Sequence, residues 1–312
     1  DVWQFNALDY KSFFSVPVLY RLNVATVGTC HGGDIQKMPE VNYGRRLDSF
    51  FDDYFNKSIR KCTLVTSISD TVRSEYLNAG VPPDCIRDVP NGLNINYIKG
   101  LGVDRGQTRK ELNWPIEKLV LLTVGRNHPK KGYIYIPAII KILLSNRNDF
   151  VWVIIGKGAE EMSQKAEKMG VGAFLQTIPQ IGITSTNPTI MLPPEELVRA
   201  YKSADVFVFP TLLETFGNVQ PEAMAAGLPV ITTDAPGARD VVKHEVTGLI
   251  SPVGDAVAMA RNIERVLFDT ALKEKLIRNG ISEVEKYGWE KVAAKYCDVY
   301  EEAINKRLRK TT

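Results

Sequence analysis

Two glutamates, eight positions apart, bracket a loop whose residues could bind a sugar. Glu214 and Glu222 flank Phe216-Gly217-Asn218, after an apolar run at 206–209 and before a helical stretch at 221–226. Ligands of open α/β sheets bind where such a loop follows the carboxyl end of a parallel strand, and the free amides of a helix start favour a phosphate. A carboxylate accepts hydrogen bonds from paired hydroxyls, so these acids suit a sugar or a ribose. The alternative is that both acids only cap and solvate the helix.

A cluster of basic residues follows another apolar run, at 119–124. Arg126, Lys130 and Lys131 stand there between two glycines, which allow close backbone approach. A forked guanidinium and a point-charge ammonium together are what a diphosphate needs. The segment is not a P-loop, because the sequence contains no G-x-x-x-x-G-K-[ST]. The alternative is a solvated basic turn.

A third candidate is the loop His31-Gly32-Gly33-Asp34, which also follows a short apolar run, at 24–27. His31 is one of only three histidines. A lone histidine is more often structural than catalytic, but a place at a strand end with flanking glycines raises the expectation of a functional role. By contrast, Gly156-Lys157-Gly158 only resembles a dinucleotide-binding fingerprint. Glu161 stands where its third glycine belongs, which argues against a dehydrogenase.

The elements that must position these loops are strands and helices in alternation. Continuous rather than alternating hydrophobicity is typical of strands covered on both faces, and strand–helix repetition predicts an α/β fold with a parallel, doubly wound sheet. A turn at 90–94 and a polar stretch at 99–109 indicate a boundary between domains 1–105 and 106–312. The predicted strands and helices are 24–27, 62–67, 119–124, 151–155, 206–209 and 230–232, and 134–144, 195–203 and 221–226.

One helical stretch, Arg45–Lys61, carries an aromatic face made by Leu47, Phe50, Phe51, Tyr54, Phe55 and Ile59. The commoner interpretation of such a face is a core helix whose opposite face is exposed to solvent. The alternative is an interfacial helix in weak, peripheral contact with anionic lipid. That alternative would place the protein at the inner face of the membrane.

Composition excludes several classes of protein. Among 312 residues, 39 basic and 36 acidic side chains give a net charge of +3, too balanced to indicate nucleic-acid binding. The four cysteines form no C-x-x-C pair, so they predict neither a metal cage nor a redox motif. No apolar run approaches membrane-spanning length. We therefore expect a cytoplasmic enzyme.

Taken together, these motifs resemble the retaining glycosyltransferases of family 4, also called glycosyltransferase group 1, which have the GT-B fold of two facing Rossmann-like domains. The most specific stretch runs from Glu214 through Glu222-Ala223-Met224-Ala225 to Gly227 and Pro229-Val230. The basic turn at 125–132 is moderately specific, and the His31 loop is less so. The resemblance covers nearly the whole chain.

The resemblance implies a role for each candidate residue. Arg126 and Lys131 would hold the donor diphosphate, and Glu222 would bind the nucleotide ribose. Glu214, with the backbone of Phe216, Gly217 and Asn218, would hold the transferred sugar and its phosphate. His31, with Gly33 and Asp34 in its loop, would reach the donor sugar. No aspartate pair resembling a metal site accompanies Arg126 and Lys131, which together form the diphosphate clamp. Neither a cofactor nor an obligatory metal ion is therefore expected.

The implied reaction moves a sugar from a nucleoside diphosphate to an acceptor hydroxyl, on a glycan, lipid or small molecule, with retained configuration. Two alternatives stay open: a non-catalytic module that binds nucleotide sugars, and another GT-B activity such as a phosphorylase or an epimerase. Members of the family begin with a strand and a glycine-rich acceptor loop that have no match in this sequence. We therefore expect an incomplete N-terminal domain.

Overall fold

The computed structural model describes residues 1–181 and 193–309, and these residues form two compact units. The first unit comprises Asp1–Gly92, Leu213–Phe216 and the segment from Lys286 onward, and the second comprises Leu93–Leu212 and Gly217–Glu285. The chain thus leaves the first unit at Gly92, ahead of the boundary predicted near residue 105. Its last helix returns to the first unit, whereas the predicted boundary places all residues after 105 in the second.

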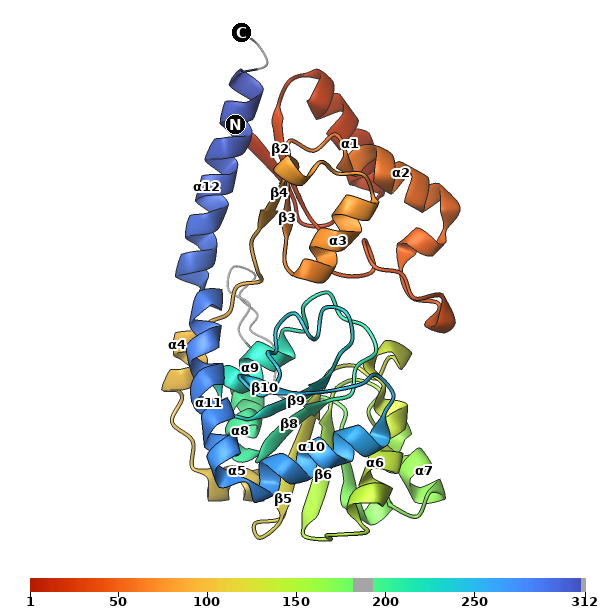
Figure 1. Cartoon of the computed structure of the whole chain (residues 1–312), viewed down its shortest axis with the longest axis vertical. Coiled ribbons are helices and arrows are strands. Elements are labelled where there is room, and N and C mark those ends of the chain that lie inside the picture. Colours follow the sequence, from red (N-terminus) through yellow and green to blue (C-terminus); the bar gives the residue numbers. More distant parts are fainter. Residues whose placement is uncertain (182–192, 310–312) are drawn as a thin grey trace. The chain divides into compact units, whose positions relative to one another are not determined.

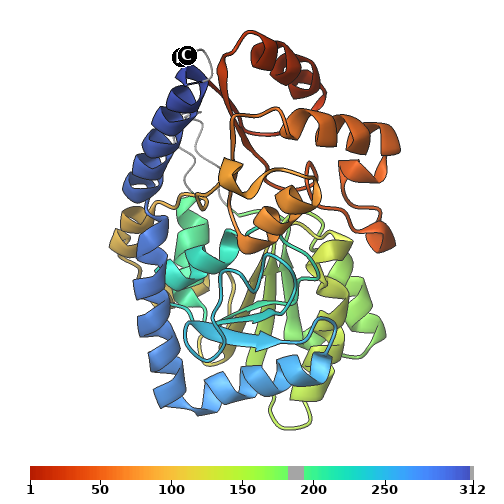
Figure 2. The same cartoon turned by 45° about the horizontal axis from the view of Figure 1, so that its top comes forward.

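The first unit is a four-stranded parallel sheet with helices on both faces. Figures 1 and 2 show α12, in blue, on one side of this sheet and α1, α2 and α3, in red to orange, on the other. In sheet order its strands are β1 (Val2–Phe5), β2 (Ala25–Thr29), β3 (Leu64–Ser67) and β4 (Ile86–Asp88). Its helices are α1 (Tyr10–Arg21), α2 (Ser49–Ile59), α3 (Asp70–Asn78) and α12 (Trp289–Leu308).

The return of α12 to the first unit has a clear physical cause. Val292, Val299 and Ala303 on this helix pack against the buried face formed by Ala25 and Val27 of β2 and their neighbours. Without α12 that face of the sheet would be exposed to water, at a cost of roughly 25 cal/mol per Å² of apolar surface. Burial of the sheet therefore assigns the helix to the first unit.

The second unit is a six-stranded parallel sheet, also covered on both faces. Figure 1 shows α6, α7 and α10 on one side and α5, α8 and α9 on the other. In sheet order the strands are β10 (Gly248–Ser251), β9 (Val230–Thr233), β8 (Val206–Phe209), β5 (Leu119–Val124), β6 (Phe150–Ile155) and β7 (Leu175–Ile178). The helices are α4 (Ile95–Gly100), α5 (Arg105–Glu111), α6 (Ile136–Leu143), α7 (Glu161–Lys168), α8 (Glu195–Ser203), α9 (Val219–Ala225), α10 (Ala256–Phe268) and α11 (Thr270–Val284).

The apolar strands of the second unit are buried on both faces, as their continuous hydrophobicity predicts. Every residue of β6, β8 and β9 is buried. Alternate side chains, such as Leu121, Trp152 and Val206, pack with Ile139 of α6 and Ile263 of α10 in one cluster. The predicted doubly wound α/β sheet is confirmed.

The order of the strands reverses between β5 and β8. These two strands are neighbours, although β6 and β7 lie between them in sequence. Ligands bind outside the carboxyl ends of the strands at such a switch point. The basic turn after β5 and the loop after β8 therefore begin at adjacent points of one sheet edge.

A buried carboxylate fastens α5 to this sheet. Asp205, directly before β8, accepts a hydrogen bond from the backbone amide of Val120 at 2.8 Å and from Arg109 at 2.7 Å, and it pairs with Arg105 as well. Arg109 also donates to the carbonyl of Ser203 at 3.0 Å. The pairing offsets the cost of burying charge and fixes the start of both strands at the switch point.

The aromatic helix of the first unit is mainly a core helix. In α2, Phe51, Phe55 and Ile59 are buried, Tyr54 is half-buried, and Phe50 is 59% exposed. The core interpretation is confirmed for the buried residues. No helix within residues 1–181 and 193–309 is long and apolar enough to cross a membrane.

Candidate functional site

The basic turn of the second unit is held in a conformation that only glycine adopts easily. Gly132 has a φ of 65°, and a Cβ there would lie 1.9 Å from the carbonyl oxygen of Pro210. The carbonyl of Lys130 accepts hydrogen bonds from the Leu212 amide at 2.7 Å and the Thr211 hydroxyl at 3.0 Å. The turn after β5 is therefore fastened to the segment that follows β8, as the switch point allows.

The three cations of this turn are held differently. Arg126 is exposed, and within the part of the chain that the structure describes its guanidinium makes no hydrogen bond or ion pair. Lys130 is buried. Lys131 is half-buried, with its Nζ 4.9 Å from the centre of the Phe209 ring. The ring restrains the ammonium group of Lys131 through a cation–π contact, while Arg126 keeps its donors available.

The positive potential of the turn is visible in a neighbouring imidazole. The pKa of His128 lies below its usual value, first because of burial and then because Lys130, Arg126 and Lys131 repel a proton. The neutral form of His128 is therefore favoured. A diphosphate placed at this turn would meet concentrated positive charge.

Glu222 lies in the first turn of α9 and is half-buried. Loss of water around its carboxyl group raises its pKa to about 7, although the hydroxyl of Tyr201, at 3.0 Å, acts in the opposite direction by donating a hydrogen bond. Tyr201 itself is fully buried in α8. The carboxylate is thus oriented by a fixed hydroxyl, and it favours partners that donate hydrogen bonds.

The loop that leads into α9 is shaped by a glycine and a buried amide. Gly217 has a φ of 76°, and its carbonyl accepts a hydrogen bond from the Gln220 amide at 2.9 Å. The side chain of Gln220 is fully buried and donates to the Ala238 carbonyl at 3.3 Å. Gly217 and Asn218 therefore form the entry to α9, and their contact with a phosphate stays a prediction.

The His31 loop follows β2 in the first unit. The buried carboxylate of Asp34 accepts hydrogen bonds from the backbone amides of His31 at 3.2 Å and Gly32 at 2.8 Å. The carbonyl of Gly33 accepts one from the Arg45 amide at 2.7 Å. In this structure Asp34 thus holds the loop, while its predicted contact with a donor sugar stays a prediction.

His31 is exposed. Its pKa is lowered because surrounding protein removes part of its water, against the opposing effects of Asp34 and of a hydrogen bond with Asn91. His31 is therefore mainly neutral at pH 7, a form that can both donate and accept a hydrogen bond.

Residues Leu213–Phe216 group with the first unit and are hydrogen-bonded to the His31 loop. The hydroxyl of Thr215 donates to the His31 carbonyl at 2.6 Å, and the carbonyl of buried Glu214 accepts from the side chain of Gln36. The hydroxyl of Ser69 donates to the Thr215 carbonyl at 2.6 Å. The structure thus brings His31 and Glu214 together in the first unit, and Arg126, Lys131 and Glu222 belong to the second.

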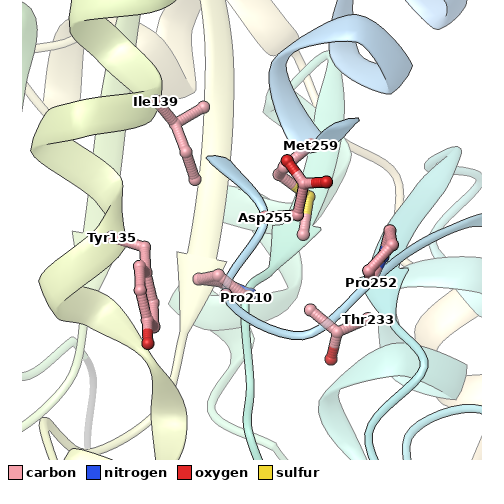
Figure 3. Close-up of a pocket in the computed structure, with 8 residues that line it drawn as sticks. Tyr135, Ile139, Pro210, Thr233, Pro252, Asp255 and Met259 are labelled. Carbon is pink, nitrogen blue, oxygen red and sulfur yellow. The ribbon is translucent and has the colours of Figure 1, made fainter. Parts of the chain in front are cut away.

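A small cavity also lies at the carboxyl edge of the second sheet. Figure 3 shows Tyr135 and Ile139 on one side of it, Thr233, Pro252, Asp255 and Met259 on the other, and Pro210 between them. Its volume is about 10 Å³, which is room for one water molecule. In this form it is too small to hold a sugar or a base.

Several residues of the site carry no signal in the sequence. Tyr201 stands 21 positions before Glu222 in a different helix, and Phe209 reads only as part of a strand. Gln36 could not be linked to Glu214, which lies 178 positions away. Asn91 belongs to the turn at 90–94, but its contact with His31 requires the fold. Among the described residues, no group of three His, Cys, Asp or Glu side chains could hold a metal ion.

Known sequences match this chain along most of its length. Residues 104–283 match the family Glycosyl transferases group 1, and residues 5–97 match Glycosyltransferase Family 4. An uncharacterized glycosyltransferase of Methanocaldococcus jannaschii is 27% identical over 96% of this chain and 73% of its own length. The D-inositol 3-phosphate glycosyltransferase of Acidothermus cellulolyticus is 29% identical over 80% of this chain and 55% of its own length. A phosphatidyl-myo-inositol mannosyltransferase of Mycobacterium leprae is 28% identical over 75% and 58%. The chain therefore spans only about half of the length of the last two relatives.

Solved structures agree on the fold. Anabaena HepE, crystallised in complex with UDP, has a TM-score of 0.78 and 17% identity over 96% of this chain and 78% of its own. Sucrose-phosphate synthase of Thermosynechococcus elongatus has a TM-score of 0.74 and 24% identity over 96% of this chain and 73% of its own. The two Rossmann-like units thus have the GT-B fold. Since the first of the two family matches covers more than half of the residues, the chain belongs to the family Glycosyl transferases group 1.

Proposed function

We propose that this chain moves a sugar from a nucleoside-diphosphate sugar to an acceptor hydroxyl with retained anomeric configuration. In this reaction the bond between the anomeric carbon and the diphosphate oxygen breaks, and a bond to the acceptor oxygen forms on the same face. The proton of the acceptor goes to an oxygen of the departing diphosphate.

The observation that carries the proposal is the pairing of two features in the second unit. A turn with three cations follows β5, and the oriented carboxylate of Glu222 follows the neighbouring strand β8. Arg126 and Lys131 suit a diphosphate, and Glu222 suits the two hydroxyls of a ribose. As negative charge grows on the leaving diphosphate, fixed cations stabilise the transition state more than the ground state.

The His31 loop and the loop that leads into α9 are assigned to the sugar. In the proposal, Glu214 and the backbone of Phe216, Gly217 and Asn218 hold the transferred sugar and its phosphate, and His31 donates or accepts a hydrogen bond at a sugar hydroxyl. Asp34 positions His31 through the backbone of the loop, because its carboxylate accepts hydrogen bonds from amides there. Glu214 is a binding residue in this scheme and not a nucleophile.

The test is release of nucleoside diphosphate on addition of an acceptor. UDP-, GDP- and ADP-sugars are first screened by thermal unfolding, where a ligand at a hundredfold its Kd adds about 2.7 kcal/mol of stability. The donor that binds is then tested with acceptors. The first are inositol phosphate and phosphatidylinositol, because these compounds appear in the names of two relatives. Product formed with the opposite anomeric configuration would contradict retention.

The same assay separates the alternatives. A non-catalytic module would bind the donor and release nothing with any acceptor. A phosphorylase would consume inorganic phosphate and release a sugar phosphate, and an epimerase would give a nucleotide sugar without an acceptor.

The roles of the two glutamates can be divided by calorimetry. Glu222→Gln should weaken binding of the free nucleoside diphosphate, because the ribose contact is lost. Glu214→Gln should leave that binding unchanged and impair transfer. Equal losses of nucleotide affinity in both variants would contradict the assignment.

A further inference from the structure

The first unit contains a second cavity that the proposed transfer reaction does not use. It has a volume of about 300 Å³, and its lining includes Tyr20, Arg60, Thr63, Asp84, Lys306 and Arg307. This volume is at the lower end of the range for small-molecule sites, about 300–1,000 Å³.

The cavity lies at the edge of the sheet opposite the His31 loop. Thr63 immediately precedes β3, and Asp84 lies two residues before the start of β4. The cavity is therefore at the amino ends of these parallel strands. His31, by contrast, follows the carboxyl end of β2. A ligand in this cavity would therefore not occupy the site of the donor sugar.

The walls of the cavity carry an excess of positive charge. Three cations, Arg60, Lys306 and Arg307, face one carboxylate, Asp84. Lys306 pairs with Asp84 at 3.3 Å and lies 4.0 Å from Glu302, which does not line the cavity, so Arg60 and Arg307 supply the excess of positive charge. Arg60 donates to the Ala79 carbonyl at 2.7 Å through Nε, and it forms no ion pair within residues 1–181 and 193–309. The cavity therefore favours an anion.

The guanidinium of Arg307 is held in place before any ligand arrives. Arg307 is only 6% exposed, its Nε donates to the Thr63 hydroxyl at 2.9 Å, and its guanidinium carbon lies 4.8 Å from the centre of the Tyr20 ring. A side chain that is already ordered loses little further entropy when it binds. A guanidinium fixed in this way matches the geometry of a phosphate group.

We propose that this cavity binds a small organic phosphate, with Arg60, Lys306 and Arg307 around the phosphate group. The inference is independent of the transfer reaction, because it concerns the opposite edge of the first sheet. The size of the cavity accommodates a compact organic portion beside the phosphate, and the Tyr20 ring offers that portion an apolar wall.

The chain provides its own reporter for occupancy. Cys85 lines the cavity and is half-buried, whereas Cys297 on α12 is exposed and does not line it. The rate of alkylation of each cysteine by iodoacetamide is followed by peptide mass spectrometry, with glucose 6-phosphate as the probe. The protein carries Arg126→Ala and Lys131→Ala, so that the basic turn of the second unit does not compete. At ten times its Kd the probe should slow alkylation of Cys85 by about tenfold through simple occupancy and leave Cys297 unchanged.

Further variants identify the cations as the cause. Arg60→Ala with Lys306→Ala should abolish the protection, because two of the three cations that line the cavity are lost. Both side chains are exposed or partly exposed. Lys295→Ala is the matched control, since Lys295 is exposed on the same helix as Lys306 and lies outside the cavity. Protection by glucose alone, protection that survives loss of both cations, or equal protection of Cys297 would each overturn the proposal. So would the absence of protection in a protein that circular dichroism shows to be folded.

Discussion

At the scale of single residues, Arg126 and Lys131 share one turn but differ in how firmly they are held. The ammonium group of Lys131 is restrained by the Phe209 ring, and Arg126 is exposed. We expect Arg126→Ala and Lys131→Ala each to lower kcat/KM for transfer by about two to three orders of magnitude, the scale for losing one preorganised donor.

Steady-state kinetics with the identified donor measure this effect. Lys141→Ala is the control, because Lys141 is exposed on α6 in the same unit and away from the turn. Near-normal turnover of Arg126→Ala or Lys131→Ala, or a comparable loss of kcat/KM in the control, would contradict the role of these cations in transfer. EDTA should leave the rate of the parent unchanged if these cations compensate the diphosphate charge.

The raised pKa of Glu222 has a consequence for stability. Its pKa is about 7 in the folded protein against an ordinary value of 4.5, so between these values the unfolded chain loses the proton first. Ionisation of Glu222 therefore destabilises the fold as the pH rises from about 4.5 to 7, and the penalty is complete above pH 7. Without nucleotide, Glu222→Gln should be more stable than the parent at pH 8, by up to about 3 kcal/mol, and nearly equal at pH 5.

Urea unfolding at the two pH values checks this expectation. A second acid, Glu160, is exposed, and Glu160→Gln is the matched control for replacing a glutamate by glutamine. A Glu222→Gln variant that is less stable than the parent at pH 8 would show that the carboxylate is compensated in the folded state.

The sequence singles out the candidate residues of the site but not the partners that hold them. Arg126, His31 and Glu214 are recognisable because glycines and apolar runs surround them, and both features are local. The contacts that orient these residues are not local. Tyr201 reaches Glu222 from another helix, and Gln36 reaches the carbonyl of Glu214 across 178 positions. The role of Asp34 in holding its own loop was missed because a carboxylate among glycines suits a ligand equally well.

At the scale of the elements, the turn after β5 depends on the conformation of one glycine. Gly132 combines a φ of 65° with an approach to the Pro210 carbonyl that leaves no room for a Cβ. We expect Gly132→Ala to lower the free energy of unfolding by at least about 2 kcal/mol, from backbone strain together with the displaced carbonyl. Because the turn carries Lys131, affinity for nucleoside diphosphate should fall as well.

Gly102→Ala is the matched control for this substitution. A Cβ at Gly102 would meet no atom within 4 Å, and this glycine has no left-handed conformation. Chemical denaturation of both variants gives the comparison. Equal stability of Gly132→Ala and Gly102→Ala would mean that the turn relaxes without cost.

The elements themselves were predictable where hydrophobicity is continuous. The runs at 119–124 and 206–209 coincide with β5 and β8, and 195–203 coincides with α8. Short strands such as β4 and β7 were not predicted, because polar residues interrupt them and leave no continuous hydrophobic run. The apolar face of α12 does not indicate which of two sheets it covers, so its return to the first unit needed the structure.

At the scale of the whole molecule, the two units differ in how continuous they are in sequence. The second lies within residues 93–285, whereas the first needs α12 to cover one face of its sheet. We expect residues 93–285, expressed alone, to fold cooperatively and to bind nucleoside diphosphate, since they include Arg126, Lys131 and Glu222. Residues 1–92 alone should not unfold cooperatively, because the face around Ala25 and Val27 would be exposed.

Thermal unfolding followed by circular dichroism, with calorimetry for the nucleotide, measures both fragments. Adding residues 286–312 to the first fragment through a flexible linker should restore a cooperative transition. A well-folded 1–92 fragment would show that the contacts of α12 are dispensable for the first sheet.

The separation of α12 from the strands that it covers also bears on synthesis of the chain. Arg307 donates to Thr63 across 244 positions of sequence. At about 5–20 residues per second, a ribosome needs roughly 10–40 s to translate the stretch between residue 92 and α12. During that interval the first sheet is present in the cell without its second layer of helix, and its apolar strands are open to chaperones or to other nascent chains. The second unit is complete before this layer arrives, so the half of the protein made first is the half that finishes folding last.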